Sequence, residues 1–139
     1  MIILDTNVIS ELMRHQSHEA VINWLDKQTD EELAITSVTV AEILYGVKQL
    51  PSGKRKTQLY EAAMMMFEED FPDLVLSFDR GAAEYYADIV STRGHIGKPI
   101  NIADAQIAAI CRVYGAVLAT RNTKDFEHIE IMLINPWKK

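Results

Sequence analysis

Short apolar runs alternate with longer segments of helical periodicity, and this alternation limits the possible folds of the chain most strongly. The first run is residues 2–4, and similar runs lie at 33–35, 74–76, 116–119 and 131–134. Between them, apolar residues recur at intervals of three and four positions, which is typical of helices with one buried face. Because parallel strands need helical crossovers, the pattern predicts an α/β fold with a mostly parallel five-stranded sheet flanked by helices.

Capping residues mark several of the expected helix ends. Ser17, Asp79 and Asn101 are expected to be N-caps, and Gly115 is the expected stop of the last helix. The expected helical segments are 8–13, a segment around 21–25, 38–49, a segment that ends near 69, a segment after 79, and 101–113.

The length and composition predict one globular domain over residues 1–139. Hydrophobic residues make up 48% and charged residues 24% of the 139 residues, which is ordinary for a soluble domain. The N-terminus lacks the pattern of a secretory signal, and no apolar run approaches the ~20 residues of a membrane span. With Cys111 as the single cysteine, no internal disulfide is possible. We therefore expect a cytoplasmic protein without membrane contact.

The net charge is −6, which by itself argues mildly against a nucleic-acid ligand. That argument weakens if some of the carboxylates are gathered in one pocket that holds cations, because bound metal ions can invert the local electrostatics. Composition therefore leaves nucleic acid open as a partner.

Acidic and amide side chains follow the apolar runs at the points where parallel strands would end. Asp5 follows the first run, and Glu42 lies in the first turns of the helix after the second. Asp104 lies in the first turn of the last long helix, and Asn122 and Asp125 follow the fourth run. The carboxyl ends of parallel strands share one edge, which is where ligands bind in open α/β sheets. We expect these side chains to meet there.

Each acid taken alone also has a purely structural explanation. Asp5 is placed to cap a helix, Thr39-x-x-Glu42 matches a capping box, and Asn101-x-x-Asp104 resembles one. Acids at helix N-termini are also stabilised by the helix dipole. The local sequence does not decide between capping and chemistry.

Taken together, the acids favour a metal site. Asp5, Glu42 and Asp104 sit among apolar or small residues without a neighbouring Lys or Arg, and an unpaired buried charge is costly. Mg²⁺ would balance several carboxylates at once, because it prefers oxygen ligands and is commonly completed by substrate phosphate. We therefore predict cleavage of a phosphodiester by water, with Asp5 and Asp104 as principal ligands and Glu42 binding metal or orienting the water.

Neighbouring polar residues are expected to support this site. Side chains that would hold the carboxylates in place by hydrogen bonds are Thr6, Asn7, Thr120 and Asn122. The basic residues placed to meet substrate phosphates are Arg121 and Lys124.

The ordered motifs of the chain resemble those of PIN-domain proteins. They are LDTNVI at 4–9, TVAE at 39–42, AD at 103–104, ATRN at 119–122 and INPW at 134–137. The set covers essentially the whole chain. More narrowly, it is similar to the VapC toxins of bacterial type II toxin–antitoxin systems, including the FitB branch.

The resemblance implies a Mg²⁺- or Mn²⁺-dependent ribonuclease. Asp5, Glu42 and Asp104 match the three core acids of the family. Where the family often has a fourth acid this chain has Asn122, and Asp125, three residues later, matches the acid of those VapC proteins that also have Asn there. The four catalytic acids would thus be Asp5, Glu42, Asp104 and Asp125. The family further implies homodimers, RNA targets that are often tRNA, and a small antitoxin that wraps the toxin and obstructs its acidic pocket.

Two other functions stay open from the sequence. A non-catalytic module that binds a partner protein or RNA is favoured by the substitution at Asn122. A phosphatase with Asp5 as nucleophile is disfavoured, because Asn7 stands where the common Asp-x-Asp motif needs its second acid.

Overall fold

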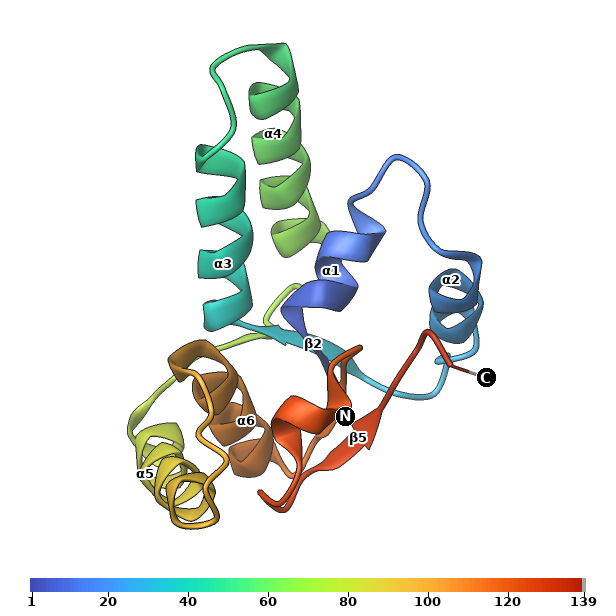
Figure 1. Cartoon of the computed structure of the whole chain (residues 1–139). Helices are drawn as coiled ribbons and strands as arrows, with labels where there is room; N and C mark the ends of the chain where they lie inside the picture. The colour runs from blue at the N-terminus through green and yellow to red at the C-terminus, as the bar shows by residue number, and fades with distance from the viewer. Residues whose placement is uncertain (139) are drawn as a thin grey trace.

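The computed structural model describes residues 1–138 and places the strands in one parallel sheet (Figure 1). The order across the sheet is β3-β2-β1-β4-β5, and each neighbouring pair is parallel. The predicted α/β class is confirmed, and the sheet is wholly rather than mostly parallel. The strands are β1 (Ile2–Leu4), β2 (Leu33–Thr36), β3 (Val75–Leu76), β4 (Val117–Ala119) and β5 (Met132–Ile134).

Helices connect the strands and cover both faces of the sheet. Among residues 1–138, no helix is both long enough and apolar enough to cross a membrane. The helices are α1 (Thr6–Leu12), α2 (Glu19–Asp26), α3 (Ser37–Lys48), α4 (Lys54–Glu69), α5 (Arg80–His95), α6 (Ile102–Tyr114) and the short 3-10 helix η1 (Thr123–Phe126).

Most of the predicted caps are confirmed. Asp79 and Asn101 cap α5 and α6 through side-chain oxygens that accept backbone N–H bonds. Gly115 ends α6 in the left-handed conformation with φ of 59°, where a glycine avoids a Cβ clash. The prediction for Ser17 was wrong. His18 caps α2, since its Nδ1 accepts the backbone N–H of Ala20, while the Ser17 hydroxyl donates to the carbonyl of Glu11.

Two apolar layers enclose the sheet, because successive side chains of a strand point to opposite faces. Ile3 of β1 packs with α5 and α6, in a layer that also contains the fully buried Cys111. Ile2 and Leu4 pack on the other face with α1, α2, α3 and α4. Parallel sheets are normally covered on both sides in this way.

The strand order places β1 at the topological switch point of the sheet. From β1 the chain moves through β2 to β3, and then crosses back to β4 on the other side of β1. The crevice at such a point, beyond the carboxyl ends of the strands, is the usual ligand site of an open α/β sheet. The pair α3 and α4 extends away from the sheet beside this point (Figure 1).

Candidate active site

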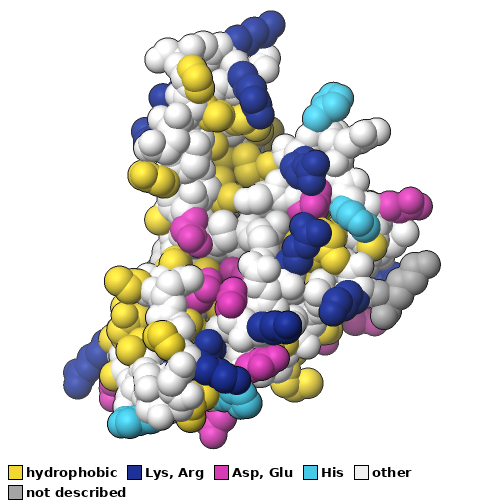
Figure 2. All heavy atoms as spheres, in the orientation of Figure 1, with side chains coloured by type: hydrophobic (Ala, Val, Ile, Leu, Met, Phe, Trp, Pro, Cys, Tyr) yellow, Lys and Arg dark blue, Asp and Glu magenta, His cyan; other side chains and the backbone are white. Residues whose placement is uncertain are grey.

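A cavity of about 490 Å³ opens at the switch point. Three of the predicted acids line it, while Asp125 lies exposed on η1 and is not a lining residue. Figure 2 shows acidic side chains gathered near the middle of one face, with Lys and Arg side chains along one side of them. The lining residues are Asp5, Thr6, Asn7, Ser10, Glu11, Arg14, Glu42, Asp104, Arg121, Asn122 and Trp137.

Asp5 is both a helix cap and a buried acid of the cavity. Its side chain is 4% exposed, and Oδ1 accepts the backbone N–H of Thr6 at 2.8 Å. Oδ2 accepts the hydroxyl of Thr120 at 2.7 Å. Burial raises the pKa of Asp5 against the effect of these two bonds, and the nearby charges of Glu42 and Asp125 raise it further. The two explanations offered by the sequence are therefore compatible.

Thr120 uses its whole hydrogen-bonding capacity at the site. Its single proton goes to Asp5, and its oxygen accepts from Asn7 Nδ2 at 3.3 Å and from the backbone N–H of Asn122 at 3.1 Å. Asn7 Oδ1 in turn accepts the backbone N–H of Arg121 at 3.3 Å. Among the described residues, the side-chain amide of Asn122 makes no hydrogen bond, so Asn122 acts here through its backbone.

We expect Thr120→Val to destabilise the protein by about 2 kcal/mol, because a hydrogen bond to a buried charge is lost and two donors lose their acceptor. Urea unfolding at neutral pH measures the change. Thr120→Ser is the matched control, since it keeps the hydroxyl and should lose much less. Equal losses of stability in the two variants would contradict the dominant role given to the hydroxyl.

Glu42 is held by a chain of hydroxyls. Thr6 Oγ1 donates to Glu42 Oε1 at 2.7 Å and lies 2.9 Å from Thr39 Oγ1. Since the one proton of Thr6 goes to Glu42, Thr39 donates to Thr6. The capping box that was the structural alternative for Thr39 and Glu42 does not form. The helix α3 begins two residues before Thr39, so Thr36 is its N-cap and accepts the N–H of Thr39 at 3.1 Å.

Asp104 is half-buried in the first turn of α6. Asn101 accepts the backbone N–H of Asp104 at 2.8 Å and donates its own amide to Asp104 Oδ2 at 2.9 Å. Burial and then the nearby charge of Asp5 raise the pKa of Asp104 to about 6, while the bond from Asn101 opposes this. The charges of Asp125 and Glu42 add smaller effects in the same direction.

The four acids repel one another without a basic partner. Within residues 1–138, none of the four forms an ion pair with Lys or Arg. No group of three or more His, Cys, Asp or Glu side chains in that range is arranged so that it could hold a metal ion alone. An all-oxygen set still suits Mg²⁺ or Mn²⁺, which keeps waters and needs only one or two carboxylates beside a substrate phosphate. The residues therefore fit such an ion, and the three predicted ligands stay a prediction.

Of the two basic side chains predicted at the site, one lines the cavity and the other does not. Arg121 lines the cavity, with its guanidinium 5.2 Å from the ring centre of Trp137. Lys124 is exposed on η1 and does not line the cavity. Arg14 lines the cavity instead, and its Nη1 lies 3.5 Å from Oε1 of the buried Glu11. Sequence reasoning did not place Arg14 or Trp137 at the cavity. Both positions depend on the path that the chain takes after α1 and after β5, which brings these residues back to the cavity.

Comparison with known proteins gives a consistent assignment. The PIN domain family matches residues 2–131. The VapC ribonuclease Y4jK of Sinorhizobium fredii is 40% identical over 138 residues, and 99% of each chain is covered. The tRNA(fMet)-specific endonuclease VapC of Shigella flexneri is 25% identical, with 96% of each chain covered.

Solved structures agree with the sequence relatives. The crystal structure of FitAcB from Neisseria gonorrhoeae contains a chain that is 40% identical, with a TM-score of 0.93 and complete coverage of both chains. A toxin–antitoxin complex from Klebsiella pneumoniae shares the fold at 21% identity, with a TM-score of 0.68 and complete coverage of both chains. The chain therefore belongs to the PIN-domain family, as a toxin of the VapC type.

Proposed function

We propose that the chain is a Mg²⁺- or Mn²⁺-dependent endoribonuclease and acts as the toxin of a type II toxin–antitoxin pair. The observation that carries this proposal is the gathering of Asp5, Glu42 and Asp104 from three separate segments in one cavity, where none of them forms an ion pair with Lys or Arg among residues 1–138. Such a charge pattern is unfavourable in the free protein and becomes favourable when a divalent cation and a phosphate are present.

The residues divide into cation-binding and phosphate-binding groups. Asp5 and Asp104 hold the cation, and Glu42, oriented by Thr6, helps to bind it or accepts a proton from the attacking water. When bound, the cation lowers the pKa of a water and stabilises negative charge on the scissile phosphate. Arg121 and Arg14 line the same cavity and bind phosphates of the substrate backbone.

We propose RNA, and tRNA in particular, as the substrate. The relative from Shigella flexneri is by its name an endonuclease specific for tRNA(fMet). Despite a net charge of −6, basic side chains lie close to the acids (Figure 2). A homodimer and a cytoplasmic location stay predictions.

The test of this function is cleavage of total tRNA by the purified protein. We expect cleavage in Mg²⁺, none in EDTA, and recovery on addition of Mn²⁺, with sequencing of the RNA ends to identify the site. Cleavage that continues in EDTA would overturn the metal mechanism. Binding of RNA without cleavage in any metal would favour the non-catalytic alternative raised by Asn122.

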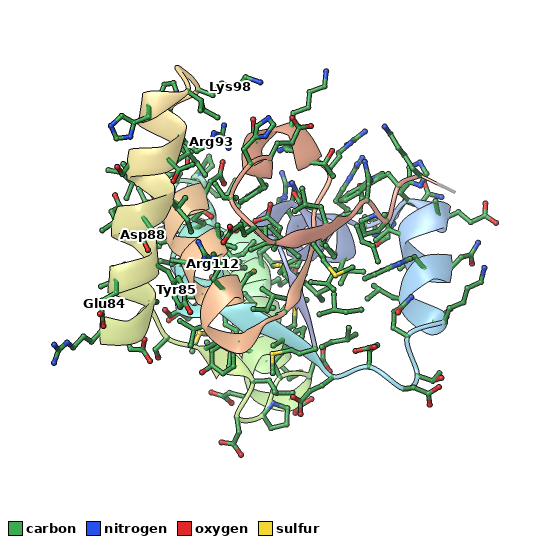
Figure 3. The ribbon with its side chains drawn as sticks, turned by 90° about the horizontal axis from the view of Figure 1, so that it is seen from below. Glu84, Tyr85, Asp88, Arg93, Lys98 and Arg112 are labelled. Atoms are coloured by element: carbon green, nitrogen blue, oxygen red, sulfur yellow. The ribbon has the colours of Figure 1, made fainter. Side chains whose placement is uncertain are left out.

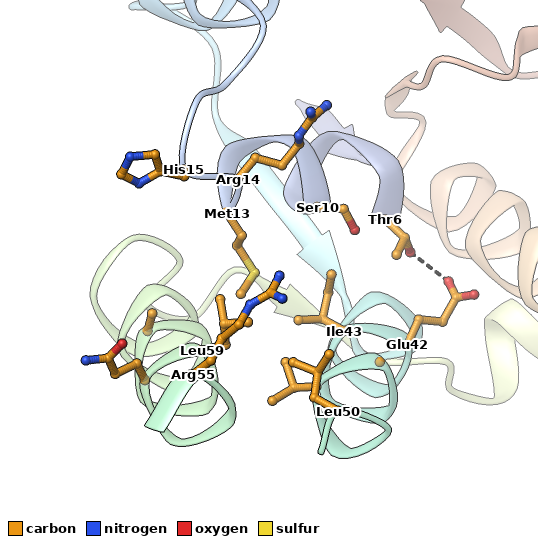
Figure 4. A pocket seen from close by; sticks show the side chains of 14 residues that line it. Thr6, Ser10, Met13, Arg14, His15, Glu42, Ile43, Leu50, Arg55 and Leu59 are labelled. Atoms are coloured by element: carbon orange, nitrogen blue, oxygen red, sulfur yellow. Dashed lines mark hydrogen bonds between the residues drawn. The ribbon is translucent and has the colours of Figure 1, made fainter. Parts of the chain in front are cut away.

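We also propose the docking site of the antitoxin. A groove of about 710 Å³ runs between α1, α3 and α4, with an apolar floor that includes Ile43 and Leu59 (Figure 4). Arg14 and Arg55 lie on its rim. The groove continues into the acidic cavity, because the two share Thr6, Ser10, Arg14 and Glu42. An amphipathic antitoxin segment seated in the groove would therefore reach the acids and block them.

We expect Leu59→Asp to weaken binding of the antitoxin roughly 30-fold, since a carboxylate buried in an apolar groove costs at least about 2 kcal/mol. Co-expression with the antitoxin encoded beside the toxin, followed by titration calorimetry, measures the loss. Met65→Asp on the same helix is the control, because Met65 is 58% exposed and does not line the groove. RNA cleavage should be unchanged in both variants, and equal antitoxin affinity in both would contradict this docking site.

A further inference from the structure

Arg93 is a buried cation that the cavity does not explain. It lies near the C-terminal end of α5 with 6% of its surface exposed (Figure 3). Within residues 1–138 it has no carboxylate partner, and its guanidinium donates only to backbone carbonyls. A buried charge without an ion pair is costly unless its hydrogen bonds are well satisfied.

The carbonyls that Arg93 holds belong to two separate segments. Nε donates to the carbonyl of Lys98 at 2.6 Å, in the loop that leads to α6. Nη1 donates to the carbonyl of Asp125 at 2.7 Å and to that of Glu127 at 3.3 Å. Lys98 also donates its N–H back to the carbonyl of Arg93 at 2.9 Å. One guanidinium thus ties the segment before Asp104 to the segment that carries Asp125.

The contact from Arg93 reaches the backbone of Asp125 and not its side-chain carboxylate. Among the described residues, no hydrogen bond reaches that carboxylate, in contrast to the other three acids. The neighbouring Phe126 is buried and anchors η1 on one side. The two bonds from Arg93, to the carbonyls immediately before and after Phe126, fix the rotation of the segment about that anchor.

We propose that Arg93 is a positioning residue that holds the backbone of η1 against the loop before α6, so that the Asp125 carboxylate, although outside the cavity lining, stays close enough to support the cation that Asp5 and Asp104 would hold. This inference rests on the proposed function. Partners behind metal ligands that orient them commonly change metal affinity 10–100-fold when they are replaced. Small displacements of a reacting group also reduce rates strongly.

Lysine cannot replace arginine in this role. The guanidinium is a planar fork with five donors, so that separate N–H groups reach separate segments. A lysine ammonium keeps the charge but presents it from one nitrogen at the end of a flexible chain. Arg93→Lys therefore preserves charge and removes the geometry. Arg93→Met removes both and guards against a folding defect caused by a buried ammonium.

The experiment compares the affinity for Mn²⁺ and the cleavage of tRNA by wild type, Arg93→Lys and Arg93→Met. Arg112→Gln is the matched control, because Arg112 on α6 is also partly buried but pairs with Glu130 and lies over the ring of Tyr85 on α5 (Figure 3). Calorimetry measures the affinity for Mn²⁺, and thermal unfolding verifies that each variant is folded. We expect Mn²⁺ to bind about 10–100-fold more weakly in the Arg93 variants and normally in Arg112→Gln.

Two further readouts separate positioning from general stability. In the Asp125→Asn background, Arg93→Lys should cause no additional loss of Mn²⁺ affinity, because the residue through which it acts is already changed. Excess Mn²⁺ should restore most of the kcat of Arg93→Lys. Additive losses, a kcat that excess metal does not restore, or normal Mn²⁺ affinity in a folded Arg93→Lys protein would overturn the proposal.

The outcomes also distinguish this inference from the proposed function. Wild-type protein that neither binds Mn²⁺ nor cleaves RNA would overturn both. Should both Arg93 variants fail to fold, the side-chain Nε–H of Arg93 in the wild type gives the test. The exchange of this proton with solvent should be slower at saturating Mg²⁺ than in EDTA, because metal binding and the hydrogen bonds of Arg93 stabilise each other reciprocally. Mg²⁺ takes the place of Mn²⁺ in this measurement because it is diamagnetic. Unchanged exchange would overturn the proposal.

Discussion

Asp5→Asn is expected to lower kcat/KM for RNA cleavage roughly 10³-fold, which corresponds to about 4 kcal/mol of lost transition-state stabilisation. The reason is that Asp5 is the most buried of the four acids and the one whose charge repels Asp104 most strongly. Asn keeps the shape and the oxygen that caps α1, and Asn is as good an N-cap as Asp. Cleavage kinetics in saturating Mg²⁺ measure the loss.

The control for this variant is Asp79→Asn. Asp79 also caps a helix, since its Oδ1 accepts the N–H of Ala82 at 3.0 Å at the start of α5, but it does not line the cavity. We expect unchanged cleavage and nearly unchanged stability in this variant. A similar loss of activity in both variants, or wild-type activity in Asp5→Asn, would contradict the role given to Asp5.

Asp104→Asn is expected to stabilise the metal-free protein by about 1 kcal/mol at pH 7.5, a rise in Tm of roughly 3 °C. The charged Asp104 is destabilising in the folded state, because it is partly desolvated and repelled by Asp5, Asp125 and Glu42. Asn keeps an oxygen that can accept the amide of Asn101. This value of about 1 kcal/mol allows for screening by solvent, since the Asp104 side chain is only half-buried.

The sign of the pH dependence follows from the raised pKa. The pKa of Asp104 is 3.8 in its ordinary environment and about 6 in the folded protein. Between these values the folded state binds more protons than the unfolded state, so the stability of the metal-free wild type falls as the pH rises. The gain in free energy of unfolding from Asp104→Asn should therefore be absent below about pH 4, grow up to about pH 6 and stay constant at higher pH.

Thermal unfolding in EDTA across this pH range makes the comparison. Asp88→Asn is the control, because it neutralises an exposed acid on α5 that does not line the acidic cavity (Figure 3). Added Mg²⁺ should raise the Tm of the wild type and leave that of Asp104→Asn nearly unchanged. A variant that is less stable than wild type at pH 7.5 in EDTA would contradict the repulsion among the acids.

The helices and strands could be read from the sequence because their causes are local. Apolar spacing decides which face of a segment is buried, and a cap is set by one side chain and the N–H groups just after it. Asp79, Asn101 and Gly115 are examples. Where two neighbouring residues can both cap, local reasoning fails. Thus His18 takes the place expected for Ser17. Similarly, Thr36 caps α3, so that the capping box that the sequence offered as an alternative for Thr39 and Glu42 does not form.

The site was predictable in its acids and much less so in the residues around them. Asp5, Glu42 and Asp104 were expected at one edge, and all three line the cavity. Arg14, in the loop after α1, and Arg93, on α5, carried no signal, because a basic residue in a loop or on a helix is ordinarily exposed to solvent. Their roles follow from segments distant in the chain, such as the 32 positions between Arg93 and Asp125.

The sequence by itself determined that the fold is α/β and that polar residues end its strands, because strand and helix periods are properties of short segments. Only the tertiary structure decided that β1 lies between β2 and β4 and that Asp5 is therefore buried against Thr120, 115 positions away in the chain. It also decided that the hydroxyl of Thr6 orients Glu42, 36 positions away. Contacts across such separations depend on strand order and crossovers, which no local pattern encodes.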